Sequence, residues 1–333
     1  MKPVIAFVTG GYSSEAVISY KSAVTIENNI DTDKYEVFKI DVTTDGWWYE
    51  TSTGRKIPVD RSDFSIAADG RKVTFDAVLI GIHGTPGEDG KLQGYFDLLG
   101  LPYTSCDAAT SAITFNKRYT VAVAAFGGIH VAKSLHIFKH SPISPADILK
   151  QVSLPVFVKP NNGGSSIGMS KVSKADDLAA ALEKAFNEDD QILVEEFIAG
   201  REFTVGVFRT LEGIIVLPIT EVAADADKEF FDFEAKYQGK STETTPAQID
   251  EHKADIIRKT ARKVYEILNC RGVVRIDFIY NEAKDAPYML EINTVPGQSE
   301  ASIVPQQVKV MGWSLKDFYT SLIEDALDRG KRK

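Results

Sequence analysis

Short apolar runs alternating with helical periodicity are the feature that most constrains the first hundred residues. Val4 to Thr9 is an apolar run that ends at two glycines, and a helical pattern follows from Glu15 to about Asn28. Tyr35 to Val42 and Ala77 to Ile82 read as further strands, and Trp47 to Pro58 reads as a hairpin. This alternation is typical of an open parallel sheet with helices on its faces. We therefore expect an N-terminal α/β domain over residues 1–105.

Patterns beyond Pro102 predict two further units of mixed α+β structure. In the first of them we expect one helical stretch from Asp107 to about Phe126, a strand from Val131 to Phe138 and a strand from Val156 to Lys159. We place its limits at 106–190, with a boundary near Gln191, and assign 191–333 to the last unit. The last unit has predicted strands at 203–208, 214–219, 273–280 and 288–293, and helices at 250–268 and 315–327.

Composition excludes several classes of protein. The formal net charge is -9 and the isoelectric point is near 5.2, which argues against a nucleic-acid partner, because such proteins concentrate Lys and Arg into a basic surface. No apolar run is long enough to span a bilayer, and the start lacks the apolar segment of a signal peptide, so we expect no membrane insertion and a cytoplasmic location. Cys106 and Cys270 are too few for a disulfide framework and lack zinc-ligand spacing.

Two predicted strands near the C-terminus each carry a charged face. Side chains alternate sides along a strand, so Arg275 and Asp277 share one face, and Glu291 and Asn293 share one face of the next strand. If these strands pair, three oxygen donors converge beside a guanidinium group, an arrangement suited to Mg²⁺ and phosphates. A solvated sheet face with an Arg–carboxylate pair explains the same pattern. The turn Thr294–Gly297 that follows directly favours a binding site.

A glycine- and hydroxyl-rich loop follows the strand that ends at Lys159. The backbone N–H groups of residues 160–168 could fold over phosphates, although an ordinary hairpin turn fits the composition as well. The segment 84–91 departs from a P-loop, because five residues separate Gly84 from Gly90 and Leu92 replaces the required Ser or Thr. Glycines 10 and 11 lack the rest of a dinucleotide-binding fingerprint, which makes an oxidoreductase a distant alternative.

Several single residues are ambiguous when taken alone. His83 lies in a glycine-rich loop after a strand, where open sheets bind ligands, but a lone histidine is usually structural. Glu15 at a helix start is explained by the helix dipole. The remaining charged or aromatic candidates could be ordinary surface positions: Lys117, Glu195, Glu196, Lys236 and Tyr237.

Eight segments occur together in an order that resembles the D-alanine–D-alanine ligase family of the ATP-grasp superfamily. They are GGYSSE at 10–15, HGTPGEDGKLQG at 83–94, LPYTS at 101–105, VKPNNGGSSIGMSKV at 158–172, EEFIAGREFTV at 195–205, FDFEAKY at 231–237, RIDF at 275–278 and EINTVPG at 291–297. The resemblance implies a three-domain α/β ATP-grasp architecture, with an N-terminal open parallel-sheet domain and ATP bound between two α+β domains. It also implies joining of two D-alanines through an acyl phosphate for peptidoglycan precursors.

The resemblance implies roles at the nucleotide end of the site. The residues implied to contact ATP are Lys117, Lys159, Met169, Glu195, Glu196, Phe197, Ile198, Glu202 and Lys236. Two Mg²⁺ or Mn²⁺ ions are implied at Asp277, Glu291 and Asn293, the three residues that the strand pattern brings together independently.

Roles at the substrate end are implied in the same way. Arg275 and the Gly297 backbone would stabilise the acyl phosphate and the tetrahedral intermediate. Glu15 would orient the first D-alanine, and Ser302 would bind the carboxylate of the second. The residues that would complete the pocket are His83, Ser165 and Tyr237, the last of these on a closing loop.

The identity of the second substrate depends on a few positions. Tyr237 favours D-alanine, because tyrosine at this place accompanies dipeptide formation in the family and phenylalanine accompanies depsipeptide formation. Gln298–Ala301 and Asn161–Gly164 depart from the family pattern. The alternatives are a D-alanine–D-lactate or D-alanine–D-serine ligase, and a nucleotide-binding protein that has lost the chemistry. A homodimer is plausible from the resemblance alone.

Overall fold

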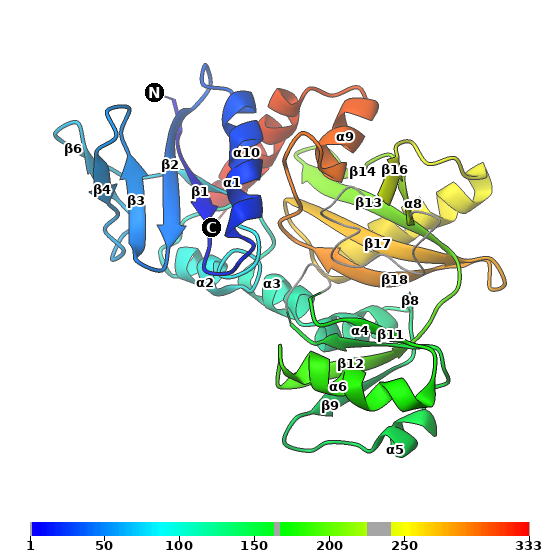
Figure 1. The fold of residues 1–333 in the computed structure, drawn as a ribbon. Helices are drawn as coiled ribbons and strands as arrows, with labels where there is room; N and C mark the ends of the chain where they lie inside the picture. The colour runs from blue at the N-terminus through cyan, green and yellow to red at the C-terminus, as the bar shows by residue number, and fades with distance from the viewer. Residues whose placement is uncertain (1, 163–166, 225–240, 333) are drawn as a thin grey trace.

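The computed structural model describes residues 2–162, 167–224 and 241–332, which form three units around a common centre (Figure 1). The N-terminal unit is built on a sheet with the strand order β4-β3-β2-β1-β7. Its strands are β1 (Val4–Gly10), β2 (Glu36–Thr43), β3 (Gly46–Glu50), β4 (Lys56–Pro58) and β7 (Ala77–Ile80), and a small hairpin of β5 (Ile66–Ala68) and β6 (Arg71–Val73) lies beside them. The centre of the sheet, β2-β1-β7, is parallel as expected, and the predicted hairpin β3-β4 makes its edge antiparallel.

The middle unit is an antiparallel sheet with the order β11-β10-β12-β9. Its elements are β9 (Ser134–Phe138), α5 (Pro145–Leu149), β10 (Val156–Pro160), β11 (Ser170–Val172), η1 (Ala175–Asp177), α6 (Leu178–Phe186) and β12 (Gln191–Glu196). The apolar face of α6 buries Leu178 and Ala185 against Val156 and Val194 of the sheet. Because β12 pairs with both β10 and β9, this sheet continues beyond the expected limit at residue 190.

The C-terminal unit holds the long sheet β16-β15-β13-β17-β18-β8, with β14 paired to β13, within the described part of the chain. Its strands are β8 (His130–Val131), β13 (Arg201–Thr210), β14 (Gly213–Val216), β15 (Thr220–Ala224), β16 (Ser241–Thr244), β17 (Val273–Asn281) and β18 (Ala286–Asn293). One face is covered by α8 (Glu251–Ile267), whose Ile257, Ala261 and Val264 are fully buried.

Two predicted elements between residues 107 and 138 are each divided in two. The expected helix is α3 (Ala108–Phe115) and α4 (Lys117–Phe126), because Asn116 has extended backbone angles and its side chain caps α4 by accepting from the Tyr119 N–H. The expected strand 131–138 is split between β8, which joins the long sheet, and β9, which joins the middle sheet. Both elements therefore connect units rather than lying within one.

The last two helices fasten the C-terminal unit to the N-terminal one. Helices α9 (Ile303–Val310) and α10 (Leu315–Lys331) share an apolar core with α1 (Ala16–Asn29) and the first sheet. Phe318 of α10 is fully buried with Phe7 of β1 and Phe208 of β13. Complete burial of such an aromatic side chain is worth roughly 2–3 kcal/mol, so this core favours a fixed arrangement of the two units.

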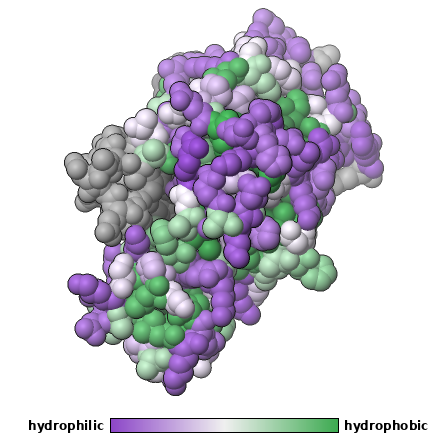
Figure 2. Space-filling model, turned by 90° about the vertical axis from the view of Figure 1, so that its right-hand side faces the viewer, coloured by the Kyte–Doolittle hydropathy of each residue, from purple (hydrophilic) through white to green (hydrophobic). Residues whose placement is uncertain are grey.

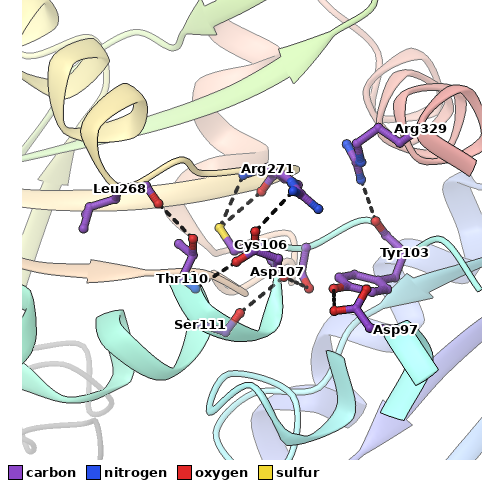
Figure 3. A network of polar contacts seen from close by, with 10 residues as sticks. Asp97, Tyr103, Cys106, Asp107, Thr110, Ser111, Leu268, Arg271 and Arg329 are labelled. Atoms are coloured by element: carbon purple, nitrogen blue, oxygen red, sulfur yellow. Dashed lines mark hydrogen bonds and ion pairs between the residues drawn. The ribbon is translucent and has the colours of Figure 1, made fainter. Parts of the chain in front are cut away.

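Polar contacts reinforce the junction where the first unit ends (Figure 3). Arg271 lies 3.2 Å from the Asp107 carboxylate, and the Thr110 hydroxyl donates to the Leu268 carbonyl at 2.9 Å. Cys106 accepts a hydrogen bond from the Arg271 N–H, and both cysteines are buried free thiols, as their number and spacing predict.

The outer surface is mainly hydrophilic on the side shown in Figure 2, with apolar side chains more evident toward the lower end, where Figure 1 places the middle unit. Within the described residues, none of the helices is both long and apolar enough to cross a bilayer.

Candidate active site

A cavity of about 360 Å³ lies between the N-terminal unit and the charged face of the long sheet. Its lining brings together residues from segments nearly 290 positions apart in the chain. Of the residues predicted from sequence, those that line it are Glu15, His83, Lys117, Glu202, Arg275, Asp277, Glu291, Asn293, Gly297 and Ser302. The ten include both predicted metal-ligating carboxylates and three of the residues predicted to bind D-alanine, Glu15, His83 and Ser302.

The floor of the cavity is the predicted pair of charged strands. β17 and β18 are antiparallel neighbours, with Arg275 opposite Asn293 and Asp277 opposite Glu291. Opposed residues of paired strands project from the same face, so the four polar side chains converge as the alternation predicted. Thr204 of β13 lies opposite Asp277 on the other side, and its hydroxyl donates to the Asp277 carboxylate.

Arg275 is held in one orientation by the carboxylates around it. Its Nε donates to Asp277 Oδ1 at 2.9 Å and its Nη2 to Oδ2 at 2.8 Å, while Nη2 lies 3.8 Å from Glu291 Oε1. Asp277 is only 5% exposed. Paired, charge-assisted hydrogen bonds of this kind are strong and directional, so the guanidinium group is fixed at the cavity floor before any ligand binds.

The donor set fits a hard divalent cation. Carboxylate and amide oxygens are the ligands that Mg²⁺ and Mn²⁺ prefer. The described residues contain no group of three or more His, Cys, Asp or Glu side chains that could hold a metal ion. A metal site in this cavity therefore needs the Asn293 amide beside Asp277 and Glu291. The Asn293 Nδ2 is buried without a hydrogen-bond partner among the described residues, which leaves this amide without the contacts that would fix its orientation.

The opposite wall of the cavity comes from the N-terminal unit. Glu15 directly precedes α1, and burial raises its pKa, with Lys117 opposing that change and Glu291 adding to it. His83 is 5% exposed, and burial lowers the pKa of its imidazole to about 4, so the ring is neutral at pH 7. The Ser19 hydroxyl of α1 accepts from the His83 N–H at 2.9 Å and anchors this loop to the helix.

Glu88 also lines the cavity, although it is not among the residues predicted from the sequence. Its carboxyl oxygens accept from the Gly84 N–H at 2.7 Å and from the Val295 N–H at 3.2 Å, so it joins the first unit to the turn after β18. Burial, followed by the nearby charge of Glu15, raises the pKa of Glu88 to about 8. A signal was present, because Glu88 belongs to the quoted segment at 83–94.

Two more cavity residues were missed on the sheet side. Thr204 lies two positions after Glu202 in β13 and therefore on the same face. Glu243 of β16 lies opposite Val222, which in turn lies opposite Glu202, and burial raises the pKa of the Glu243 carboxyl. Period-two alternation could have found Thr204, whereas Glu243 required knowledge of the strand order.

The remaining predicted nucleotide contacts lie on the middle sheet, outside the cavity lining. Lys159 Nζ lies 2.6 Å from the Glu195 carboxylate, Glu196 accepts from the Lys133 N–H at 2.9 Å, and the Met169 carbonyl accepts from Lys184 at 3.0 Å. Phe197 is 37% exposed, and its neighbour Ile198 is partly exposed. The other predicted site residues, Ser165, Lys236 and Tyr237, lie outside the described residues.

Two hydrogen bonds connect the start of the predicted phosphate loop, residues 160–162, to α4. Asn161, the second residue of the loop, is fully buried and accepts from the Lys117 N–H at 3.1 Å through its backbone carbonyl. Its side-chain oxygen accepts from the Arg118 N–H at 2.9 Å. The start of the loop is thus fixed at the N-terminal end of α4 by two of the first backbone N–H groups of that helix.

Comparisons with known proteins agree over nearly the whole chain. Residues 4–106 match the family described as D-ala D-ala ligase N-terminus, and residues 117–324 match D-ala D-ala ligase C-terminus. The D-alanine--D-alanine ligase of Flavobacterium johnsoniae is 46% identical over 97% of this chain and 99% of its own, and that of Phocaeicola vulgatus is 44% identical over 98% and 99%. The crystal structure of the VanG D-Ala:D-Ser ligase from Enterococcus faecalis superposes with a TM-score of 0.86 at 31% identity, covering 97% of this chain and 99% of that one.

Proposed function

The chain belongs to the D-alanine–D-alanine ligase family, and from this premise we propose how its cavity carries out the family's reaction. It has the ATP-grasp fold and is an ATP-dependent ligase that joins two D-alanines for peptidoglycan synthesis. One observation carries the residue-level proposal. The cavity places a fixed guanidinium group, two carboxylates and an amide opposite the Glu15 and His83 wall.

The first step transfers the γ-phosphoryl group of ATP to a carboxylate oxygen of the first D-alanine, giving an acyl phosphate and ADP. We assign Lys117 and Arg275 to the phosphoryl oxygens, because both line the cavity and Arg275 is already oriented. Lys159 and Lys236 complete the phosphate contacts in this proposal. The adenine and ribose are assigned to the middle-sheet segment 195–198, with Met169 and Glu202.

Asp277, Glu291 and Asn293 would hold two Mg²⁺ or Mn²⁺ ions. Bound metal would neutralise the charge that the transferred phosphoryl group carries. Arg275 fills a complementary role from the protein, since its guanidinium group lies between the two carboxylates and faces the same space. The oxygen donors that Asp277, Glu291 and Asn293 bring to the cavity support this assignment.

In the second step the amine of the second D-alanine attacks the acyl carbonyl carbon, and phosphate leaves. Glu15 is assigned to the ammonium of the first D-alanine, since its carboxylate borders the cavity at a helix start. The Gly297 N–H and Arg275 face the oxygen on which negative charge develops. Ser302 at the start of α9 is assigned to the second carboxylate, while Ser165 and Tyr237 are assigned to the first D-alanine subsite.

The alternative second substrates are less well supported. Relatives 44–46% identical to the chain are named as D-alanine--D-alanine ligases, whereas the D-Ala:D-Ser ligase is 31% identical. A non-catalytic nucleotide-binding protein would have no need of the fixed Arg275–Asp277 pair beside Glu291 and Asn293. We therefore assign D-alanine to both subsites.

The cellular location, the oligomeric state and the domain limits complete the proposal. We place the enzyme in the cytoplasm, where ATP and the peptidoglycan precursors are made. A homodimer is proposed from family resemblance and is tested by light scattering on the purified protein. The boundary near residue 105 is kept in this proposal, and the one expected at residue 190 is moved past β12, because β12 pairs with β10 and β9.

The central experiment mixes purified protein with ATP, Mg²⁺ and D-alanine and identifies the product by mass. We expect D-alanyl-D-alanine with one ADP for each peptide bond. L-Alanine is the matched control and should give no dipeptide. Protein that binds ATP yet forms no dipeptide would overturn the proposed function.

A further inference from the structure

The turn after β18 is bonded, on the side away from the cavity floor, to residues that are not among the predicted site residues. The Gln298 N–H donates to the Ser22 hydroxyl of α1 at 3.1 Å, and Ser22 Oγ lies 2.9 Å from His83 Nε2. Ser22 is fully buried, and Gln298 is 5% exposed. A chain of buried polar groups thus runs from the turn, through α1, to a cavity-lining histidine.

The hydrogen bonds of this chain have a defined direction. Among the described residues, the acceptor within reach of the proton of the buried Ser22 hydroxyl is His83 Nε2. A buried hydroxyl seldom leaves its proton unpaired, so Nδ1 carries the ring proton and Nε2 of the neutral ring is an acceptor. Ser22 can satisfy it, because its oxygen receives the Gln298 N–H and its own proton remains to be donated.

Gln298 is itself fixed through both ends of its side-chain amide. Its Nε2 donates to the Pro296 carbonyl at 3.2 Å, and its Oε1 accepts from the Tyr319 hydroxyl of α10 at 3.1 Å. Tyr319 is 1% exposed. The amide therefore connects the turn to the helix that joins the C-terminal and N-terminal units.

Packing alone does not hold the turn, because a void of about 20 Å³ lies directly behind it. The void is lined by Val295, Pro296, Gln298 and Tyr319, among others. A space of this size is about that of one water molecule, and the residues that line it lose van der Waals contacts there. The hydrogen bonds of the turn therefore add to the packing of Val295 in fixing its position.

Two hydrogen bonds fix the backbone on either side of Gly297. Val295 N–H is taken by Glu88 and Gln298 N–H by Ser22, while Gly297 lines the cavity between them. Preorganised donors are effective because they need no reorientation as charge develops, so small shifts of the turn matter.

We propose that Ser22, Gln298 and Tyr319 are positioning residues that set the tautomer of His83 and aim the Gly297 turn at the D-alanine subsite. This inference rests on the proposed function for its kinetic consequence, but the tautomer is a property of the protein alone. The three residues act through His83 and the turn and do not contact the reacting atoms.

The first test is the tautomer. Protein labelled with ¹⁵N-histidine is compared with Ser22→Ala by long-range nitrogen–proton NMR at pH 7.5. The wild type should show one neutral ring protonated on Nδ1, and Ser22→Ala should shift that ring toward the Nε2–H form or a mixture. An unchanged His83 pattern in Ser22→Ala overturns the proposal. Ser65→Ala, which alters a buried serine bonded to Asp63 away from the cavity, is the matched control.

The second test separates positioning from stability. Gln298→Leu leaves the Tyr319 hydroxyl without its partner, whereas the double variant Gln298→Leu/Tyr319→Phe removes both groups and should recover much of the lost stability. We expect the KM for D-alanine to rise roughly fivefold or more in both variants, the equivalent of one lost hydrogen bond, with the KM for ATP unchanged. Recovery of the D-alanine KM together with stability would overturn the proposal. If the wild type makes no dipeptide, the proposed function fails, and the NMR result still decides the role of Ser22.

Discussion

Replacement of Glu88 by Gln should change how the stability of this protein depends on pH. The Glu88 carboxyl accepts two backbone N–H groups, from Gly84 and Val295, and its pKa is raised to about 8 by burial and by Glu15. The folded-state pKa therefore lies above the value of 4.5 for an ordinary Glu. Stability from the protonated carboxyl is fully present below pH 4.5 and is lost as the pH rises through 8.

The magnitude follows from the interval between the two pKa values. Between pH 6 and pH 8 the Glu88 side chain is ionised in the unfolded state and protonated in the folded state. The free energy of unfolding therefore falls by about 1.4 kcal/mol for each pH unit. The wild type should therefore lose about 3 kcal/mol between pH 6 and pH 9 through Glu88, and little more above pH 8. This figure is an upper limit, because the side chain is only partly shielded from the cavity.

Glutamine is neutral at every pH and cannot show this loss. Its amide has one acceptor oxygen for two backbone donors, so the variant also loses about 1–3 kcal/mol at all pH values. That offset cancels when two pH values are compared. We expect the stability of Glu88→Gln relative to the wild type to rise by up to about 3 kcal/mol from pH 6 to pH 9.

Urea unfolding of the ligand-free protein, followed by tryptophan fluorescence at both pH values, measures this difference. Glu50→Gln, which alters an exposed glutamate of β3, is the control and should show no pH-dependent change. If Glu88→Gln and the wild type lose stability in parallel between pH 6 and pH 9, the conclusion that Glu88 is protonated in the folded state is refuted.

Three further predictions address the cavity. Glu291→Gln should leave the fold intact but weaken Mn²⁺ binding in the presence of a non-hydrolysable ATP analogue, measured by electron paramagnetic resonance; undiminished Mn²⁺ binding would remove Glu291 from the metal site. Arg275→Ala should lower kcat by roughly a hundredfold or more, the cost of removing about 3 kcal/mol of transition-state stabilisation, and a change confined to the KM for ATP would contradict this role. Tyr237→Phe should raise the ratio of D-alanyl-D-lactate to dipeptide and increase uncoupled ATP hydrolysis; an unchanged product ratio with tightly coupled ATP use would exclude Tyr237 from the specificity site.

Local patterns in the sequence were sufficient for the charged floor of the cavity. Arg275 and Asp277 face the same way because side chains alternate along any strand, and the same holds for Glu291 and Asn293. The pairing of β17 with β18 places Asp277 opposite Glu291, as the prediction required. Most strands of the N-terminal unit were predictable for the same reason, since apolar runs bounded by turn residues are signals within a few neighbouring residues.

Boundaries between units were harder to predict from the sequence, because they depend on residues distant in the chain. The expected helix 107–126 breaks at Asn116, and the first turn of α4 donates two backbone N–H groups to Asn161, a residue outside that window. The expected limit at residue 190 divides a sheet that β12 completes by pairing with β9 and β10. Periodicity identifies a strand but does not reveal its neighbours.

The sequence alone thus determined the fold class, the order of the motifs and the residues of the charged face on β17 and β18. Only the tertiary structure decided which groups form hydrogen bonds with one another and which shift one another's pKa. Ser22 and Gln298 are 276 positions apart yet share a hydrogen bond, and Glu88 acquires its raised pKa from burial and from Glu15. Hydrogen-bond direction, burial and electrostatic coupling depend on distances in space, and those distances are set only when all three units pack together.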